Sequence, residues 1–559
     1  MEKVWLKSYS PGVPETIDPD QHPSLVSLIE QSFEKYSTKD AFSNLGVNLT
    51  FAQLDEKSKQ MACYLQYNLH LKKGARVAIM MPNLLQYPIA LYAVLRAGMV
   101  AVNVNPMYTG RELKHQLSDS GAEAIIILAN FAHVLADIVD ETTIRRIVVT
   151  EIADLCPWPK RILINWLVKS IKKMVPKFNL PKYECFLKAL HKGAQKSFIP
   201  VDIGAEDLAF LQYTGGTTGV AKGAMLTHRN MVANVLQSEA WFKSVIDTDK
   251  EIIITALPLY HIFSLTANCL MFTKIGGLNI LITNPRDMPG FVKELKKHRF
   301  TCFTGVNTLF NSLLNTPGIE TVDFSHLKMS FGGGMAVQPS VAKKWGALTK
   351  TVMIEGYGLT ETSPAAIVNP MDAKEFSGFI GLPISSTEVS IRDDKGNELG
   401  FNEPGEVCIR GPQVMKGYWQ RPEETADAMT EDGWFATGDI GEINKEGYIK
   451  LVDRKKDMIL VSGFNVFPNE LEAVVAEHPD VLEVAAIGIT DELSGEVVKL
   501  FIVKKNPSLT EEMVIAYCKE NLTGYKRPKY IEFLNELPKS NVGKILRKDL
   551  RAKPSESKQ

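Results

Sequence analysis

Short apolar runs rich in β-branched residues alternate along the chain with amphipathic stretches of helical length. Clear examples of these runs are residues 76–80, 124–128 and 252–256. A run of consecutive apolar residues is typical of a strand covered on both faces, and strands that alternate with helices favour parallel pairing. The pattern therefore predicts an α/β fold built from doubly covered layers.

The most apolar long window, residues 84–102, resembles a membrane span at first sight. It contains Gln86, Pro88 and Arg96, so it falls short of the roughly 20 consecutive apolar residues that a transmembrane helix needs. We expect instead a buried helix that runs into a strand.

The pattern changes twice toward the C-terminus. Residues 396–450 are short segments punctuated by glycine, which is typical of a small β-rich region of hairpins and turns. After residue 457 a new alternation of strands with a helix begins, with segments at 484–489, 497–503, 511–521 and 530–534. Because about a hundred residues can fold alone, we predict an N-terminal domain at 1–452, a charged linker at 453–457 and a C-terminal domain at 458–559.

The 559 residues are 45% hydrophobic and 23% charged, as in ordinary globular proteins. The 63 Lys and Arg against 64 Asp and Glu leave a formal net charge of -1. No global field can therefore attract nucleic acid or an anionic membrane, and any such binding must be local. The first twenty residues lack the apolar core of a secretory signal, so we expect a cytoplasmic location.

The seven cysteines stand far apart and form no Cys-x-x-Cys pair. This spacing argues against a zinc site or a disulfide framework and favours a reducing compartment. We expect all seven to be buried as small apolar residues.

The densest candidate chemistry lies in the sequence YTGGTTGVAKGA at residues 213–224. Its glycines let backbone amides approach an anion, its threonines add hydroxyl donors, and Lys222 adds a positive charge, a combination that suits a polyphosphate. The sequence is not a Walker A loop, because Ala221 replaces the second glycine and Gly223 replaces the Ser or Thr after the lysine. A flexible surface loop is the alternative.

Two carboxylates offer further chemistry. Asp439 could accept hydrogen bonds from both hydroxyls of a ribose, and Arg454 could donate to the same sugar or its phosphate. Glu361 could offer a hard oxygen to Mg²⁺ while Thr360 bonds an α-phosphate. An Asp439 that caps a turn and a Glu361 on the surface are the alternatives.

Three other features have equally simple explanations. Lys544 belongs to a segment, residues 521–559, with ten Lys and Arg against four Asp and Glu, so composition alone makes it one solvated lysine among many. His261 has no metal spacing around it and would more often be a hydrogen-bonded core histidine. The glycines at 332–334 could let a purine or an acyl chain lie against the backbone, or could form a tight turn.

The loop and six further blocks, taken in chain order, resemble the adenylate-forming superfamily, which contains acyl-CoA synthetases, luciferases and peptide-synthetase adenylation domains. The blocks are LPLYHIF (257–263), GGGM (332–335), YGLTE (357–361), TGD (437–439), DRKKD (453–457) and PKSNVGK (538–544). Residues 453–468 and 524–529 are most similar to the bacterial long-chain fatty acid CoA ligases. Peptide-synthetase domains are less similar, because they usually carry an Asp near the block of His261, and residues 259–265 contain no carboxylate.

The resemblance implies a large N-terminal domain, with two α/β layers and a small β-rich part, and a small mobile α+β C-terminal domain. It also implies that ATP converts a fatty acid to an acyl-adenylate and pyrophosphate, and that CoA then expels AMP. In this scheme Lys544 bridges the carboxylate and the α-phosphate, His261 positions the carboxylate, Glu361 binds Mg²⁺, and Lys456 is the hinge.

Thr218 is a further catalytic residue that the resemblance implies. The implied nucleotide-binding residues are Tyr213, Thr214, Gly215, Gly216, Thr217, Thr218, Gly219, Val220, Ala221, Lys222, Gly223, Ala224, Gly334, Tyr357, Gly358, Thr360, Asp439 and Arg454.

Two other functions stay open at this point. A medium-chain or aryl-acid CoA ligase would keep the mechanism and change the pocket. A non-enzymatic, membrane-peripheral fatty-acid carrier would keep only the nucleotide-binding fold, and pyrophosphate release that depends on fatty acid separates it from an enzyme.

Residues 155–183 contain seven Lys and Arg, no acidic residue, and apolar residues that include Leu163, Trp166 and Ile171. A basic amphipathic helix of this kind can lie peripherally on the inner face of the cytoplasmic membrane. An ordinary helix docked on its own domain is the alternative. Fatty acid, ATP and CoA are the expected partners, a homodimer stays open, and no nucleic acid is expected.

Overall fold

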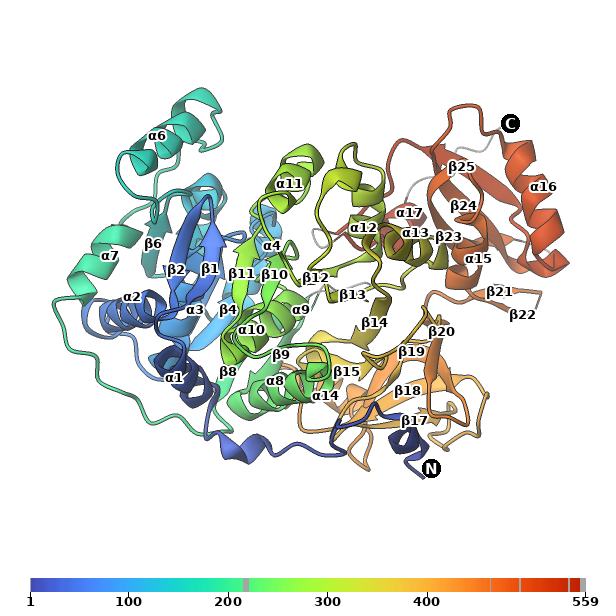
Figure 1. Ribbon diagram of the computed structural model, residues 1–559, viewed down its shortest axis with the longest axis horizontal. Helices are drawn as coiled ribbons and strands as arrows, with labels where there is room; N and C mark the ends of the chain where they lie inside the picture. Colours follow the sequence, from blue (N-terminus) through green and yellow to red (C-terminus); the bar gives the residue numbers. More distant parts are fainter. Residues whose placement is uncertain (1, 215–220, 463, 492–493, 541–542, 553–559) are drawn as a thin grey trace.

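A computed structural model describes residues 2–214, 221–462, 464–491, 494–540 and 543–552 (Figure 1). The described residues form four β-sheets, of nine, seven, four and five strands, with helices packed against them. This mixed α/β architecture, with two large layers in the N-terminal part and a smaller C-terminal part, confirms the predicted fold class.

The seven-stranded sheet is parallel except for its last strand. Its strands, in the spatial order β7-β6-β5-β3-β4-β8-β9, are β7 (Glu184–Cys185), β6 (Arg146–Thr150), β5 (Ala124–Leu128), β3 (Arg76–Met80), β4 (Val100–Asn103), β8 (Leu208–Tyr213) and β9 (Gly223–Thr227). Every residue of β4 and β5 is buried, as predicted for strands covered on both faces. The strands predicted at 76–80 and 124–128 are β3 and β5.

Helices cover this sheet, and one of them is the predicted buried helix. The helices of this part are α1 (Leu25–Lys35), α2 (Phe51–Cys63), α3 (Gln86–Arg96), α4 (Gly110–Ser120), α5 (Ala132–Ala136), α6 (Lys160–Trp166) and α7 (Phe186–Gly193). All eleven residues of α3 are buried and the chain then enters β4. None of the described helices combines the length and the apolar composition needed to cross a bilayer.

The nine-stranded sheet is parallel from β1 to β14 and has antiparallel strands at both edges. Its strands are β16 (Leu382–Pro383), β15 (Ala365–Val368), β14 (Met353–Gly358), β13 (Met329–Gly333), β12 (Cys302–Gly305), β10 (Ile252–Thr255), β11 (Leu278–Leu281), β1 (Asp40–Asn44) and β2 (Val47–Thr50). Its helices are α8 (His228–Phe242), α9 (Ile262–Ser264), α10 (Met271–Ile275), α11 (Met288–Leu295), α12 (Asn307–Leu314) and α13 (Pro339–Thr349). The strand predicted at 252–256 is β10.

The long helix α8 packs on β8 and β9 of the seven-stranded sheet and also on the helices α1 and α10. The Thr227 hydroxyl accepts from the Asn230 amide and the Asn230 side chain accepts from the Thr227 amide, which forms a capping box. This box satisfies two amides that a helix start otherwise leaves unpaired. The helix therefore starts at His228 and carries Asn234, Ser238 and Trp241 toward the site described below.

The glycine-punctuated region forms the predicted β-rich unit. Its strands are β17 (Glu388–Arg392), β18 (Gly405–Arg410), β19 (Phe435–Ile443) and β20 (Ile449–Arg454), all antiparallel, and α14 (Pro422–Ala428) lies between β18 and β19 in the chain.

The C-terminal sheet has its own cores on its two faces. Its strands and helices are β21 (Ile459–Val461), β22 (Phe464–Val466), β23 (Val481–Asp491), β24 (Gly495–Lys504), β25 (Tyr530–Leu534), α15 (Pro468–Val475), α16 (Glu511–Asn521) and α17 (Arg547–Arg551). The segments predicted at 484–489, 497–503, 511–521 and 530–534 lie in β23, β24, α16 and β25. The domain boundaries at 452 and 458 stay a prediction.

The N-terminal segment lies across the nine-stranded sheet's β16 edge. The Tyr9 hydroxyl donates to the Pro383 carbonyl at 2.6 Å, and the ring of Tyr9 meets the ring of Trp241 edge-on, with centroids 4.9 Å apart. Further along, the Ser386 amide donates to the Glu15 carbonyl at 2.8 Å.

The basic stretch at 155–183 forms α6 and a π-helical turn, Leu167–Ile171. Figure 1 shows α6 at the upper left of the molecule, at the opposite end from the C-terminal sheet. Val168 faces inward, but large apolar side chains of this stretch are exposed by more than half: Trp158, Ile162, Leu163, Trp166, Ile171 and Met174. Most of the apolar face is therefore not docked on the domain.

Six of the seven cysteines are buried and free, as predicted. The prediction is wrong for Cys185, which is exposed. Cys185 belongs to β7, a two-residue strand at the edge of its sheet, where one side is uncovered.

Candidate active site

A pocket lies where the parallel strands β13 and β14 end. In α/β sheets this carboxyl edge is the usual place for a ligand. The pocket is lined by Asn234, Ser238, Trp241, Phe242, His261, Ile262, Phe263, Thr266, Ala267, Phe331, Gly333, Gly334, Gly356, Tyr357, Gly358, Leu359, Thr360, Pro364, Ala365, Val368, Ile384 and Lys544. Six residues predicted for the site therefore meet in one pocket: His261, Gly334, Tyr357, Gly358, Thr360 and Lys544.

Lys544 reaches this pocket from the C-terminal part of the chain, so it is not one solvated lysine among many. The Thr308 hydroxyl of α12 donates to the Gly543 carbonyl at 3.0 Å. Gly543 has φ of +82°, and a Cβ there would lie 2.7 Å from the Thr308 hydroxyl oxygen, so only glycine allows this approach without a shift. Nearby, the side-chain amide of Asn311 donates to the Leu482 carbonyl at 3.1 Å. These contacts hold the C-terminal sheet against α12 with Lys544 in the pocket.

The ammonium of Lys544 is poorly solvated. Burial lowers its pKa to about 8, Arg454 acts in the same direction, and Asp439 and Glu361 oppose them. A desolvated cation interacts more strongly with an anion than a hydrated one. The pocket can therefore stabilise negative charge that gathers beside Lys544.

His261 lies in the pocket before α9. Its Nδ1 accepts from the Phe263 amide at 3.3 Å, and burial together with Lys544 lowers its pKa to about 3. The imidazole is therefore neutral at physiological pH, and it offers a hydrogen bond rather than a positive charge.

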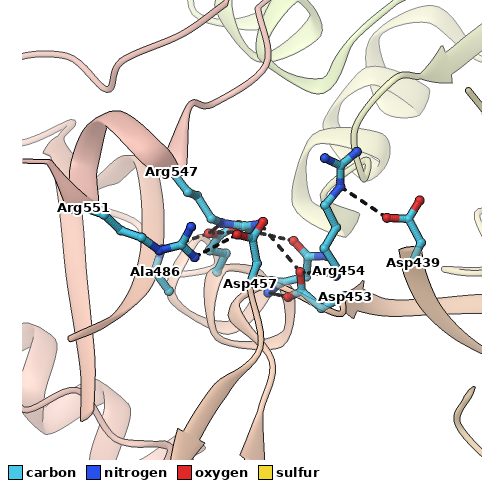
Figure 2. A network of polar contacts seen from close by, with 9 residues as sticks. Asp439, Asp453, Arg454, Asp457, Ala486, Arg547 and Arg551 are labelled. Atoms are coloured by element: carbon cyan, nitrogen blue, oxygen red, sulfur yellow. Dashed lines mark hydrogen bonds and ion pairs between the residues drawn. The ribbon is translucent and has the colours of Figure 1, made fainter. Parts of the chain in front are cut away.

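Tyr357, which lines the pocket, forms a polar group with Asp439 and Arg454. Asp439 and Arg454 face each other on the antiparallel strands β19 and β20. The buried Asp439 accepts from the Tyr357 hydroxyl at 2.6 Å and forms an ion pair with Nε of Arg454 at 3.2 Å, which Figure 2 draws. Burial and the Asp439 carboxylate raise the pKa of Tyr357. Asp439 thus sits on a strand and does not cap a turn.

The described residues of the predicted phosphate loop, 213–214 and 221–224, lie at the adjoining ends of β8 and β9, which pair as an antiparallel hairpin. Tyr213 pairs with Gly223 and Gln212 with Ala224, and the Thr214 amide donates to the Lys222 carbonyl at 2.9 Å. Gly215, Gly216, Thr217, Thr218, Gly219 and Val220 lie outside the described residues.

Glu361 is buried beside the hairpin, so the surface alternative is wrong. Its carboxylate accepts from the Tyr418 hydroxyl at 2.7 Å, and the Lys222 ammonium lies 4.3 Å from the centre of the Tyr418 ring. Thr360, the residue before Glu361, lines the pocket. Tyr418 therefore links the hairpin to the block that carries Glu361.

Sequence inspection did not single out Tyr418 or Asp119. Asp119 of α4 accepts from the Tyr213 hydroxyl at 2.6 Å and from Arg421 at 2.9 Å, and His115 contacts the Ala221 carbonyl at 3.2 Å. The helix α4 thereby contacts both stems of the hairpin. The glycine before Tyr418 is the one local sequence feature that could have drawn attention to Tyr418. No local feature marks Asp119.

Part of the pocket lining is apolar. Trp241 and Phe242 come from α8, Phe331 from β13 and Val368 from β15. Phe263 and Phe331 meet edge-on, with centroids 5.8 Å apart. The arrangement suits a ligand with an apolar chain and a polar head near Lys544.

Comparison with known proteins agrees with this chemistry. A family model described as AMP-binding enzyme matches residues 29–419, and one described as AMP-binding enzyme C-terminal domain matches residues 470–544. A long-chain-fatty-acid–CoA ligase of Escherichia coli O157:H7 is 57% identical over 99% of this chain and 98% of its own. Its counterpart from Haemophilus influenzae is 50% identical over the same shares. The solved structure of ATP-bound MatB from Rhodopseudomonas palustris has a TM-score of 0.78 at 27% identity, covering 94% of this chain and 98% of that one.

Proposed function

This chain belongs to the family of AMP-binding enzymes, and we propose that it joins long-chain fatty acids to CoA with ATP through an acyl-adenylate. The observation that carries this function is the position of Lys544, which lies in one pocket together with the polar Tyr357 and the apolar Trp241. The ligases at 57% and 50% identity over nearly the whole chain support the same substrates. These ligases give less support to the alternative of a medium-chain or aryl-acid ligase. They give the least support to a fatty-acid carrier without enzyme activity.

The first step would form the adenylate. A carboxylate oxygen of the fatty acid attacks the α-phosphorus of ATP, and pyrophosphate leaves with the electrons of the broken P–O bond. Two anions must approach for this step, and the desolvated Lys544 ammonium would lie between them and lower their repulsion. Neutral His261 would orient the carboxylate by hydrogen bonding.

The nucleotide would be held along one side of the pocket. Asp439, fixed by Tyr357 and Arg454, would accept from the ribose hydroxyls. Thr360 would donate to the α-phosphate, and the hairpin residues 213–224, Thr218 among them, would surround the other phosphates with amides and hydroxyls.

Chemistry on ATP implies Mg²⁺, and Glu361 fits a role in holding it. Its carboxylate is a hard oxygen ligand oriented by Tyr418 beside the pocket-lining Thr360, and Mg²⁺ is commonly held by one or two carboxylates together with substrate phosphates. When bound, the cation would neutralise phosphate charge.

The second step would form the thioester. The CoA thiolate attacks the acyl carbonyl carbon, the bond to the phosphate oxygen breaks, and AMP leaves with those electrons. The CoA thiol must reach the acyl carbonyl carbon, and in the first step Lys544 lies beside that group. We therefore propose that the C-terminal domain turns about Lys456 between the steps.

A CoA-ester assay over fatty acids of graded chain length tests the proposed function directly. We expect thioester formation that requires ATP, Mg²⁺ and CoA and that is highest with long-chain acids. A preference for short or aryl acids would support the alternative ligase. Failure on every acid, with no pyrophosphate released, would reject enzyme activity.

Replacing Glu361 with glutamine should raise the Mg²⁺ concentration needed for half-maximal pyrophosphate release by about tenfold or more, because the cation loses an anionic ligand while the side-chain shape is kept. Titration of Mg²⁺ at saturating ATP measures the change. Tyr418→Phe is the matched control, since it removes the hydrogen bond to Glu361 but keeps the charge. An unchanged Mg²⁺ dependence in Glu361→Gln would show that Glu361 does not hold the cation.

We further propose that α6 and the following turn contact an anionic membrane surface peripherally. Exposed Trp158, Leu163, Trp166 and Ile171 lie in the stretch 155–183, which has seven basic and no acidic residues. Apolar side chains that enter the interface together with local positive charge favour binding to anionic lipid.

Leu163→Ala combined with Trp166→Ala should weaken cosedimentation with anionic vesicles by about tenfold or more, because two exposed apolar side chains no longer enter the bilayer. Activity on detergent-dispersed fatty acid should stay near that of the parent. Met513→Ala with Tyr530→Ala, which trims exposed apolar residues of the C-terminal part, should bind vesicles normally. Equal vesicle binding by the α6 variant and the parent would argue against a membrane role.

A further inference from the structure

Six polar residues meet around the linker that joins β20 to the C-terminal sheet. We call them the linker cluster, and Figure 2 labels four of them, Asp453, Asp457, Arg547 and Arg551, to the left of Asp439. The members are Asp453, Asp457, Asn469, Glu472, Arg547 and Arg551.

Arg547 is the centre of the linker cluster. Its guanidinium donates to Glu472 at 2.8 Å and to the Asn469 side chain at 2.7 Å, and it lies 3.5 Å from Asp457, which Arg551 also contacts at 2.8 Å. All these partners follow Lys456 in the chain. They join α15, α17 and the end of the linker into one unit, and Arg547 stands three residues after Lys544.

Asp453 is the one member of the linker cluster that precedes Lys456. It belongs to β20, where it pairs with Ile440 of β19, and it is buried. Its carboxylate accepts from the Asn469 amide at 2.8 Å and lies 3.7 Å from the Arg547 guanidinium. These two contacts therefore cross the proposed pivot.

The contact with Asn469 also completes the start of α15. This helix begins at Pro468, and the residue before it, Phe467, has no side chain that can cap the helix. The Asp453 carboxylate, which belongs to another sheet, caps the helix instead. The free amides and the dipole of a helix N-terminus favour an anion at this position. Burial raises the pKa of Asp453, and Arg547 and the Asn469 and Arg454 amides oppose this rise, so the charge on Asp453 depends on these contacts.

We propose that Asp453 is a positioning residue that favours the arrangement in which Lys544 lies in the pocket. A turn of the C-terminal domain about Lys456 would carry Asn469 and Arg547 away from Asp453, which stays in its sheet. The contacts of Asp453 are then made during adenylate formation and lost for thioester formation. This inference rests on the proposed function and on the proposed pivot.

The test measures the two half-reactions separately in Asp453→Asn, which keeps the shape and removes the charge. Pyrophosphate release from ATP and fatty acid should slow by about tenfold, within the usual range of conformational couplings. Thioester formation from preformed acyl-adenylate and CoA should stay equal to that of the parent or become faster. The ratio of the two rates is the readout, since a variant that is merely less stable lowers both.

Asp394→Asn is the matched control, because Asp394 contacts Lys455 of the linker at 2.7 Å and is exposed. The ratio should not change in this variant. If Asp453→Asn fails to fold, Asp453→Ser also removes the charge opposite Arg547, with a smaller side chain, so it should show the same direction of change.

Two outcomes separate this inference from the proposed function. In the first outcome the parent is active in both half-reactions, but the ratio of the two rates is unchanged in the Asp453 variants or changes equally in Asp394→Asn. This outcome overturns the role of Asp453 alone. A parent that releases no pyrophosphate and forms no thioester overturns the proposed function and this inference with it.

Discussion

Lys544→Ala is expected to slow pyrophosphate release that depends on fatty acid by about a hundredfold to a thousandfold, the usual loss when one group that stabilises transition-state charge is removed. The physical reason is the environment of the ammonium. The ammonium is poorly solvated because it is buried, which also lowers its pKa to about 8, and a poorly solvated charge interacts more strongly with the reacting carboxylate and α-phosphate. ATP binding should change little, because Asp439 and the hairpin remain.

The measurement is a coupled pyrophosphate assay at saturating ATP, with thioester formation from preformed acyl-adenylate as the second readout. The second half-reaction should stay near the parent rate, because Lys544 is proposed to act in the first step only. Lys539→Ala is the control within the same block, since Lys539 forms an ion pair with Glu483 of β23 at 2.6 Å. A near-normal rate of pyrophosphate release in Lys544→Ala would show that the lysine has no part in adenylation.

The second large effect is expected from Lys456→Pro, which should leave adenylate formation measurable but strongly slow thioester formation from preformed acyl-adenylate. The Asp457 amide donates to the Arg454 carbonyl at 3.0 Å, so Lys456 is the third residue of a turn. Proline would fix φ near -65° and restrict the rotation that we propose for the second step.

The quantity that decides this prediction is the ratio of the rate of adenylate formation to the rate of thioester formation. Proline also constrains the residue before it, so the melting temperature must be measured, and Lys456→Ala separates loss of the ammonium from loss of rotation. Lys456→Ala should carry out both steps. A proportional fall of both steps in Lys456→Pro would mean that the turn itself is damaged, and no change in either step would place the pivot elsewhere.

Residues whose environment is local were predictable from the sequence. The apolar runs of β3, β5 and β10 and the helix α16 lie where the pattern predicts them, because periodicity records which faces are covered. The blocks of the resemblance also contain the pocket residues His261, Tyr357 and Lys544.

Contacts between segments that are distant in the sequence could not be predicted from it. Nothing near Asp119 or Tyr418 indicates that they meet Tyr213 and Glu361, because these contacts depend on the packing of α4 and of the loop after β18 on the hairpin. Composition also could not decide whether the apolar side of α6 is covered, since a docked helix and an interfacial helix share one pattern. Cys185 was wrongly predicted because burial at a sheet edge depends on neighbours that spacing does not reveal.

The contact of the N-terminal segment with the pocket wall has a consequence for biosynthesis. Tyr9 packs on Trp241 and donates to Pro383, which follows it by 374 residues. At ribosomal rates of roughly 5–20 residues per second, Tyr9 waits on the order of 20–75 s for Pro383 to be synthesised. The position of Tyr9 against the pocket residue Trp241 is therefore fixed only late in translation, and until then the N-terminal segment lacks its partner strand β16.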